Sequence, residues 1–255
     1  MNASGAGRSQ QDWLFDLGNT RLKFAPLRAD GGPGAISVLA YADGAAMDDA
    51  ALPEGGIAWL ASVAGGAVTD ALESALSRRF DQVRRARTRS RLGAVRIAYA
   101  EPARLGVDRF LAMLGAHAQA PAATLVIGVG TALTIDLMAA DGRHLGGRIA
   151  PSPALMREAL HARARQLPAA GGAFVEFAAD TDDALASGCE GAALALVERS
   201  ATRAAEALGA RPALLLHGGG APSLCPHLPE AVLRPALVLE GLAQWAMAPP
   251  RDGAP

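Results

Sequence analysis

The sequence contains one pattern twice, half a chain apart: an apolar run, a glycine turn and a second apolar run. The first copy reads DLGNT at residues 16–20, and the second reads GVGTA at residues 128–132. This recurrence indicates an internal duplication, and the helical segments after each copy make the repeat an α/β unit. We therefore expect two similar α/β domains, at residues 12–120 and 121–247, with flexible tails at residues 1–11 and 248–255.

Hydrophobic periodicity assigns the elements of each domain, with period two for strands and period 3.6 for helices. Strands are expected over residues 13–16, 21–27, 35–42, 57–63, 95–99, 124–129, 132–138, 146–151 and 213–216. Helices are expected over residues 68–80, 108–117, 153–166 and 182–207. Turns are expected at residues 18–19, 130–131 and 141–142. Ligands of paired domains usually bind in the cleft between them, which directs attention to the polar turns.

The composition excludes several classes of function. Apolar residues make up 51% of the chain and charged residues 19%, which is a globular composition. The net charge of -1 provides no field to hold a polyanion, so we expect no nucleic-acid partner. No run approaches the ~18 apolar residues of a membrane span. The first residues lack the apolar core of a signal peptide, and the two cysteines form no CxxC pair, so we expect a cytoplasmic location with no membrane partner.

The first copy of the pattern extends into a longer polar segment, DLGNTRLK. Gly18 allows a ligand to approach the backbone, and Asn19 and Thr20 can donate hydrogen bonds to phosphate oxygens. Asp16 is placed to hold Mg²⁺ directly or through water, because Mg²⁺ prefers carboxylates together with substrate phosphates. Lys23, the only lysine of the chain, offers a point charge to a phosphate. The alternative interpretation is an ordinary hairpin turn.

The second copy extends to Asp136 as GTALTID and resembles a second phosphate loop. Thr131 is placed for a β- or γ-phosphate. The alternative is again a hairpin turn, with Thr134 and Asp136 facing solvent. The recurrence favours the phosphate interpretation. Because the chain contains no GxxxxGK[ST] motif, we expect two hairpins to hold ATP in place of a P-loop.

A third segment, GVDR at residues 106–109, opens a predicted helix. Asp108 is either a residue that stabilises the helix start or a carboxylate that accepts a proton from a substrate hydroxyl. Arg109 is suited to an anionic group of the substrate. Phosphoryl transfer needs little beyond a positioned alcohol, a base and charge neutralisation. Tyr99 contacts the substrate in this interpretation and is a core tyrosine in the alternative.

Two further segments carry weaker signals. Three glycines at residues 218–220 follow an apolar strand and suit close approach to adenine or ribose, or a strand-to-helix turn. Asp180 and Thr181 precede a predicted helix. The pair indicates an N-cap, and Thr181 is also a candidate substrate contact. The five histidines show no spacing typical of metal ligands, so we treat them as structural or surface residues.

Taken in order, these segments resemble the type III pantothenate kinases. The family segment Asp-x-Gly-Asn-[ST]-Arg-x-Lys is matched at residues 16–23, and Gly-x-Asp-Arg is matched at residues 106–109. The later part of its second phosphate segment is matched at residues 130–136. The remaining matches lie at residues 146–151, 180–181, 218–219 and 239–242, and the resemblance spans about residues 13–245.

The resemblance implies a fold, a reaction and a set of site residues. The fold is two ribonuclease H-like domains of the actin-like ATPase superfold, in a homodimer. The reaction is ATP-dependent phosphorylation of pantothenate, the first step of coenzyme A biosynthesis, with Mg²⁺ and a monovalent cation, K⁺ or NH₄⁺. Asp108 is implied as the catalytic base. The implied pantothenate contacts are Tyr99, Gly106, Val107, Asp108, Arg109 and Thr181. The implied ATP contacts are Asp16, Leu17, Gly18, Asn19, Thr20, Arg21, Leu22, Lys23 and Thr131.

One position departs from the family pattern. Gly128 stands where the family normally has an aspartate that binds the monovalent cation. We therefore expect weak dependence on K⁺. Two alternatives stay open: a nucleotide-binding regulatory protein of the same fold without turnover, supported by Gly128, and a kinase of another small hydroxy substrate.

Overall fold

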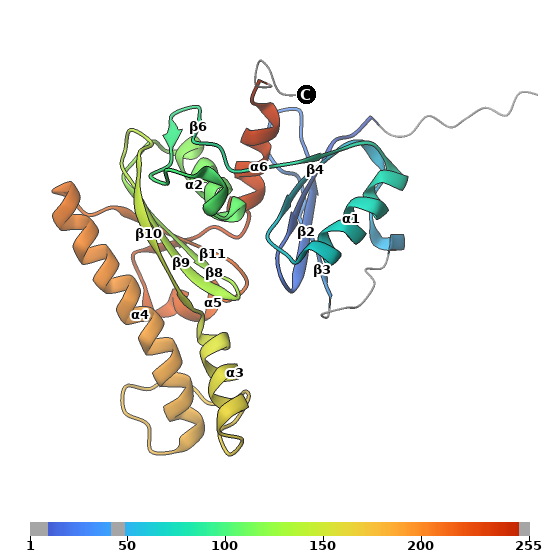
Figure 1. Ribbon diagram of the computed structural model, residues 1–255. Helices are drawn as coiled ribbons and strands as arrows, with labels where there is room; N and C mark the ends of the chain where they lie inside the picture. The colour runs from blue at the N-terminus through green and yellow to red at the C-terminus, as the bar shows by residue number, and fades with distance from the viewer. Residues whose placement is uncertain (1–9, 42–48, 250–255) are drawn as a thin grey trace, which may run out of the picture. The chain divides into compact units, whose positions relative to one another are not determined.

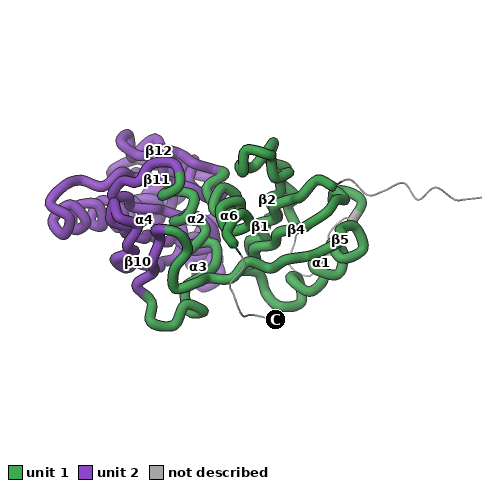
Figure 2. The backbone as a smooth tube through the Cα atoms, turned by 90° about the horizontal axis from the view of Figure 1, so that it is seen from above, with its two compact units in different colours: residues 1–93, 99–118, 236–255 green, residues 94–98, 119–235 purple. Residues whose placement is uncertain are grey.

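The computed structural model describes residues 10–41 and 49–249, which form two compact units. Unit 1 comprises residues 1–93, 99–118 and 236–255, and unit 2 comprises residues 94–98 and 119–235 (Figure 2). The division differs from a single break near residue 120, because residues 94–98 join unit 2 and the C-terminal segment joins unit 1. The assignment of two domains to residues 12–120 and 121–247 stays a prediction.

Unit 1 is built on a five-stranded sheet with the order β3-β2-β1-β4-β5. The pairs β3–β2 and β2–β1 are antiparallel, whereas β1–β4 and β4–β5 are parallel. The strands are β1 (Trp13–Leu17), β2 (Arg21–Pro26), β3 (Ser37–Ala40), β4 (Gly55–Ser62) and β5 (Phe80–Arg85). The helical elements of the unit are η1 (Asp49–Ala51), α1 (Gly66–Arg79), η2 (Pro102–Arg104), α2 (Val107–Gln119) and α6 (Leu237–Met247).

Unit 2 repeats this sheet, with the order β10-β9-β8-β11-β12 and the same sequence of antiparallel and parallel pairs (Figure 1). Its strands are β8 (Thr124–Val129), β9 (Ala132–Met138), β10 (His144–Pro151), β11 (Ala213–His217) and β12 (Ala231–Leu233). Its helical elements are α3 (Pro153–Arg163), α4 (Thr181–Leu208), α5 (Ala221–Leu224) and η3 (Cys225–His227). The matching order and directions confirm that the sequence pattern marks a duplicated fold.

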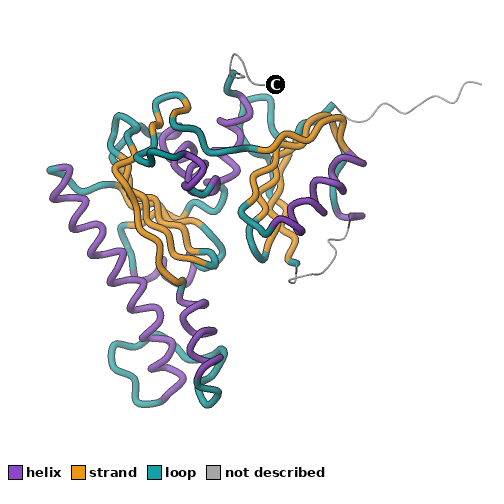
Figure 3. Tube along the Cα trace, viewed as in Figure 1, coloured by secondary structure: helices purple, strands orange, loops and turns teal. Residues whose placement is uncertain are grey.

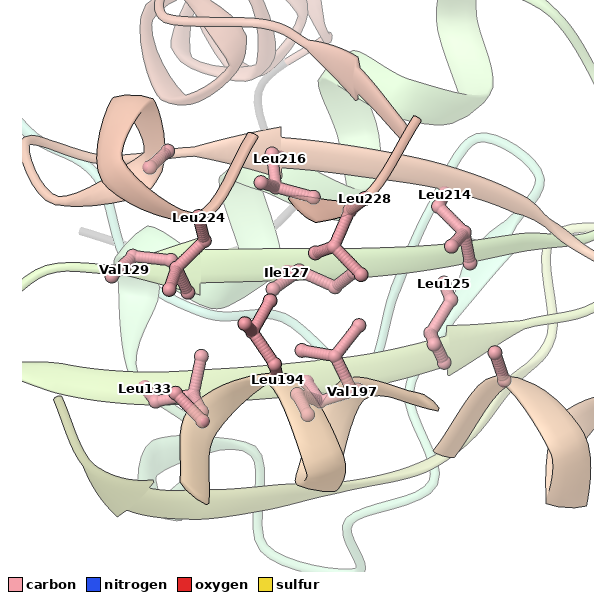
Figure 4. Packing of buried hydrophobic residues seen from close by; sticks show 14 of the residues in the cluster. Leu125, Ile127, Val129, Leu133, Leu194, Val197, Leu214, Leu216, Leu224 and Leu228 are labelled. Atoms are coloured by element: carbon pink, nitrogen blue, oxygen red, sulfur yellow. The ribbon is translucent and has the colours of Figure 1, made fainter. Parts of the chain in front are cut away.

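Each unit has its own apolar core between the sheet and its helices. In unit 1, Phe15 and Phe24 of the hairpin stack with ring centroids 5.7 Å apart, and Phe80 meets Phe15 edge-on at 5.6 Å. In unit 2, α4 covers the sheet, and Leu194 and Val197 belong to an apolar cluster with side chains of β8, β9 and β11 (Figure 4). All six residues of β8 are buried, as a central strand covered on both faces requires.

Helices α2 and α6 of unit 1 cross at very short range. A Cβ atom at Gly241 would lie 1.7 Å from the carbonyl oxygen of Leu111, and one at Gly115 would lie 2.4 Å from that of Leu237. Only glycine allows this approach. Because α6 also contacts β1 and β4, the crossing ties the start of α2, which carries Asp108, to the sheet.

Residues 94–98 are held in unit 2 by a buried polar chain. The backbone N–H of Ala98 donates to Nδ1 of His144 at 3.3 Å, and His144 Nε2 lies 3.0 Å from Asp136 Oδ1. Since Nδ1 of His144 accepts a hydrogen bond, Nε2 carries the ring proton and donates a hydrogen bond to the carboxylate of Asp136. The alternative in which Asp136 faces solvent is therefore wrong, because this carboxylate is only 1% exposed.

The structure confirms most expected elements and corrects others (Figure 3). The strand expected at residues 95–99 is only β7 (Val95–Arg96), which pairs with β6 (Arg91–Leu92) and leaves Tyr99 outside it. The arginine-rich stretch after residue 80 contains β5, an edge strand in which Arg84 stacks on Trp59 at 5.2 Å. Strand β12 and helix α6 were not expected. Residues 1–9 and 250–255 of the expected tails, and residue 42 of an expected strand, lie outside the described residues.

Over residues 10–41 and 49–249, no helix is long and apolar enough to cross a bilayer.

The crossing of α2 and α6 generates a prediction. Gly241→Ala should lower the free energy of unfolding by about 1–3 kcal/mol or more, since the added methyl group meets backbone atoms of Leu111. As a matched control, Gly188→Ala in α4 adds a methyl group with no atom within 4 Å. It should raise stability by about 0.4–1 kcal/mol. Urea denaturation measures both, and an unchanged midpoint for Gly241→Ala would contradict the close crossing.

Candidate functional site

Asp16 and Lys23 face each other at the end of the first hairpin. Asp16 is the fourth residue of β1, and the strand register pairs it with Lys23 of β2. Directly opposed residues of an antiparallel pair project from the same face of the sheet. The hairpin thereby places the only lysine of the chain beside a partly buried carboxylate.

The surroundings of Asp16 favour its protonated form. Burial of the carboxyl group raises the pKa of Asp16 from 3.8 to about 7. The charge of Lys23 lowers this pKa, and the charge of Asp108 raises it again. The influence of Asp108 shows that the start of α2 brings a second carboxylate near the hairpin, although the two residues are far apart in the sequence.

The turn between β1 and β2 is held by backbone bonds and by a tyrosine that the sequence analysis missed. The N–H of Gly18 donates to the carbonyl of Arg21 at 3.0 Å. The hydroxyl group of Tyr41, which follows β3, donates to the Gly18 carbonyl. Asn19 and Thr20 stay exposed at the tip, where a ligand can reach them. No local signal identified Tyr41, because its role depends on the pairing of β2 with β3.

Asp108 lies in the first turn of α2 with its carboxylate folded back over Gly106. Its Oδ1 accepts a hydrogen bond of 2.8 Å from the N–H of Arg109. A Cβ atom at Gly106 would lie 2.7 Å from the same oxygen, so the glycine of the GVDR segment makes room for the carboxylate. The contact with a backbone N–H fits the helix-start interpretation, and the proximity to Asp16 adds a feature that a simple cap does not need.

Arg109 and Tyr99 form a second pair in the same unit. The Arg109 side chain is only 5% exposed, and its Nη1 donates to the hydroxyl group of Tyr99 at 3.3 Å. Its guanidinium carbon also lies 5.9 Å from the centre of the Tyr99 ring. Unit 1 therefore gathers Asp16, Lys23 and Asp108, and it orients Arg109 against Tyr99.

In unit 2, the second hairpin has an exposed tip at Gly130 and Thr131. The N–H of Gly130 donates to the carbonyl of Ala132 at 2.9 Å, which closes the turn. Behind it, the carbonyl of Thr131 accepts from the N–H of Ser152 at 3.4 Å, and Ser152 caps α3. The structure confirms the predicted turn. The assignment of Thr131 to a phosphate stays a prediction.

The glycine-rich turn after β11 packs against β8. The N–H of Gly220 donates to the carbonyl of Val129 at 2.9 Å, and the turn leads into the short helix α5. This fits a strand-to-helix turn, the structural alternative for residues 218–220. Contact of this turn with adenine or ribose stays a prediction.

Gly128 occupies the position in β8 that Asp16 occupies in β1. A Cβ atom at Gly128 would lie 2.7 Å from Thr134 Oγ1 and 2.9 Å from His217 Nε2. The imidazole of His217 and the hydroxyl group of Thr134 thus occupy the space that a side chain at residue 128 would need. Alkali cations prefer oxygen ligands, so these residues do not fit a monovalent cation held by a carboxylate.

Thr181 is the first residue of α4, after Asp180, whose side chain accepts from the N–H of Asp183 at 2.9 Å. The N-cap interpretation of Asp180 is therefore confirmed. Thr181 is exposed and lines a hollow with Leu167, Ala178 and Ala184. This end of α4 projects beyond the sheet beside α3 (Figure 1). Thus unit 2 does not bring Thr181 to the turn at Thr131.

The carboxylates of unit 1 fit a divalent cation that arrives with phosphate. Asp16 and Asp108 supply the oxygen ligands that Mg²⁺ prefers. Within the described part of the chain, no group of three or more His, Cys, Asp or Glu side chains forms a metal site by itself. The pair therefore suits a cation whose other ligands are substrate oxygens and water.

The raised pKa of Asp16 generates a pH-dependent prediction. The folded protein holds a proton on Asp16 up to about pH 7, whereas the ordinary value is 3.8, so its contribution to stability falls as pH rises between these values. Asp16→Asn removes this loss. Relative to the parent, the free energy of unfolding of the variant should therefore rise by up to about 4 kcal/mol between pH 4 and pH 8.

Thermal denaturation across this pH range measures the difference. Asp30→Asn is the matched control, because the N–H of Gly32 and the Arg28 side chain lower the pKa of Asp30. The stability of Asp30→Asn should not increase relative to that of the parent as pH rises. A constant difference between Asp16→Asn and the parent at every pH would contradict the buried, protonated carboxyl group.

Comparison with known proteins gives consistent results. The family model described as type III pantothenate kinase matches residues 13–203. The type III pantothenate kinase of Xanthomonas axonopodis pv. citri (strain 306) is 61% identical over 241 residues, which cover 93% of this chain and 98% of the relative. That of Xanthomonas campestris pv. campestris (strain 8004) is 60% identical over 239 residues, covering 92% and 97%.

Solved structures agree on the fold. A protein from Campylobacter jejuni, described as a candidate Baf family transcriptional activator, has a TM-score of 0.61 at 20% identity, covering 90% of this chain and 94% of that one. A candidate 2-dehydro-3-deoxygalactonokinase from Sinorhizobium meliloti has a TM-score of 0.53 at 15% identity, covering 92% and 98%. These likenesses concern the fold alone and are consistent with the expected fold of two α/β units. The family match over most of its length shows that the chain belongs to the type III pantothenate kinase family.

Proposed function

We propose that this protein transfers the γ-phosphoryl group of ATP to the primary hydroxyl group of pantothenate, the first step of coenzyme A biosynthesis. The family membership carries the reaction class. The observation that carries the chemistry is the pair of carboxylates in unit 1: the charge of Asp108 raises the pKa of Asp16, which faces Lys23 across the hairpin. A kinase needs a base for the attacking alcohol and a carboxylate for the metal that accompanies ATP.

Asp108 is the base in this mechanism. Its carboxylate accepts the proton of the hydroxyl group while that oxygen bonds to the γ-phosphorus and the bond to the β-phosphate oxygen breaks, which releases ADP. The bond from the N–H of Arg109 and the space over Gly106 hold the carboxylate in one orientation. The buried guanidinium group of Arg109, oriented by Tyr99, attracts the carboxylate of pantothenate. Gly106, Val107 and Thr181 complete the proposed pantothenate contacts.

Residues 16–23 and Thr131 are the proposed ATP contacts. The exposed Asn19, Thr20 and Thr131 offer side-chain and backbone donors to phosphate oxygens at the tips of two equivalent hairpins. Lys23 adds positive charge next to Asp16. Bound Mg²⁺ supplies charge neutralisation on the phosphates, and Asp16 is the carboxylate that holds it, directly or through water.

A coupled assay of ADP release tests the reaction on the purified protein with ATP and Mg²⁺. We expect ADP release to depend on pantothenate. It should be absent with D-sugars and with a pantothenate analogue whose primary hydroxyl group is replaced by hydrogen. Turnover of a sugar in place of pantothenate would support a kinase of another substrate. ATP binding without any turnover would support the regulatory alternative.

The role of Asp108 is tested by Asp108→Asn in the same assay. Turnover should fall by about 10²-fold or more, because the amide cannot accept the proton. Binding of ATP, measured by calorimetry, should change little. Asp70→Asn, at an exposed position of α1 in the same unit, is the control and should keep full turnover. Near-full turnover of Asp108→Asn would show that another group is the base.

The protein also forms a homodimer in this proposal. Unit 2 exposes large apolar side chains on β10, on α3 and on the loop after α3, including Ile149 at 65% and Phe177 at 98%. Strand β10 is also the edge of its sheet. Exposed apolar groups of this size commonly mark contact surfaces, and a second copy of the chain is the proposed partner.

Substitution of Phe177 tests this surface. Phe177→Ser should raise the dissociation constant of the dimer about tenfold or more, as expected for an aromatic anchor. Met247→Ser, which changes a residue 63% exposed on α6 of unit 1, should leave the constant unchanged. Sedimentation velocity at several concentrations measures both variants. A monomeric parent protein would refute the dimer.

The cytoplasmic location expected from the sequence stays a prediction.

A further inference from the structure

The two units differ at one row of residues across their sheets. In unit 1, the strand registers place Lys23, Asp16 and Ala61 side by side on β2, β1 and β4. In unit 2, the equivalent row on β9, β8 and β11 is Thr134, Gly128 and His217. Since both sheets have the same order and directions, the rows correspond residue by residue.

Between the two rows, the large and the small side chain stand on opposite strands: the central strand has the large one in unit 1, and its parallel neighbour has the large one in unit 2. Unit 1 has a carboxylate on the central strand and a methyl group on the parallel neighbour, Ala61. Unit 2 has no side chain on the central strand and an imidazole on the parallel neighbour, His217. The imidazole Nε2 lies 2.9 Å from where a Cβ atom at Gly128 would be, so the ring fills the space that a side chain there would need.

This exchange removes a carboxylate from the neighbourhood of the second hairpin tip. A carboxylate beside the phosphates of ATP repels them unless a cation lies between the two. Gly128 brings no such charge, and the imidazole of His217 adds N–H donor capacity on the same face. The row therefore requires no additional cation, and it provides no carboxylate oxygen to hold one.

We propose that His217 takes the place of a carboxylate-bound monovalent cation in unit 2, so that turnover and ATP binding need no added K⁺ or NH₄⁺. The inference rests on the proposed function and names the group that fills the space of the missing carboxylate and offers an N–H donor there. His217 is a positioning residue here, acting on the electrostatics of the phosphate loop. Thr134 Oγ1 lies 2.7 Å from the same Cβ position at Gly128 and further limits the space there.

The first test compares cations on the parent protein at constant ionic strength. ADP release and the ATP dissociation constant are measured with tetramethylammonium, K⁺ or NH₄⁺ as the added cation. We expect both quantities to change by less than about threefold, well below the roughly tenfold or larger effect of losing an electrostatic contact in a site. Strong activation by K⁺ would overturn the inference and leave the kinase assignment intact.

The second test substitutes His217 and Gly128, two residues of the row in unit 2. His217→Ala should lower turnover or ATP affinity by about tenfold or more, without recovery on addition of K⁺, because no carboxylate is present. The double variant Gly128→Asp/His217→Ala gives β8 and β11 the Asp and Ala that unit 1 has at Asp16 and Ala61, and it should become dependent on K⁺. His227→Ala, at an exposed histidine of the same unit, is the matched control and should behave as the parent.

The outcomes separate the two proposals. Absence of pantothenate-dependent ADP release in the parent contradicts the proposed function, while the ATP dissociation constants still decide the role of His217. Full turnover and unchanged ATP affinity of His217→Ala would refute that role. Thermal denaturation checks that each variant is folded. If the double variant does not fold, the parent and His217→Ala titrations decide the question by themselves.

Discussion

Each sheet is organised by a central strand buried on both faces, and this constraint decides where polar groups can stand. In β8 all six residues are buried, and in β1 both Leu14 and Phe15, which point to opposite faces, are fully buried. A charged group in such a strand is costly unless it lies near the end of the strand with a partner. Asp16 meets this condition, one residue before the end of β1 and opposite Lys23. The polar hairpin tips are therefore a consequence of the burial of the strands.

The sequence predicts the features that depend on local patterns. The glycine turns, the antiparallel hairpins and the long helix α4 follow from apolar periodicity and turn residues, and the structure confirms them. The edge strand β5 was missed because most of its side chains are exposed and many are charged, so it lacks the apolar alternation of a half-covered strand. Helix α6 is apolar around most of its surface, which removes the periodic signal.

The features that depend on distant contacts could not be predicted. Asp136 ends the second phosphate-like segment, yet it is buried, because its carboxylate bonds to the imidazole of His144, which in turn accepts from the N–H of Ala98. The role of Tyr41 requires the pairing of β2 with β3, and the clash at Gly128 requires the register of β11. The departure from the family pattern at Gly128 was visible in the sequence, but the residue that fills its space was not. In each case the missing information is the position of a partner, which no local pattern contains.

The coupling between Asp16 and Asp108 connects the fold to the reaction. Burial of Asp16 and the nearby charge of Asp108 both raise the pKa of Asp16, so near pH 7 the ligand-free unit holds a proton on Asp16 for part of the time. A base must be ionised to accept a proton, and a metal ligand must be ionised to bind its cation. Protonation of Asp16 removes the like charge that lies near Asp108. In the proposed mechanism, Asp16 would hold the cation that accompanies ATP, and the positive charge of that cation would offset the second carboxylate charge beside Asp108. If Asp108 is the base and Asp16 the metal ligand, as proposed, the pair would keep the base ready before ATP binds and would tolerate two ionised carboxylates afterwards, which neither residue could do alone.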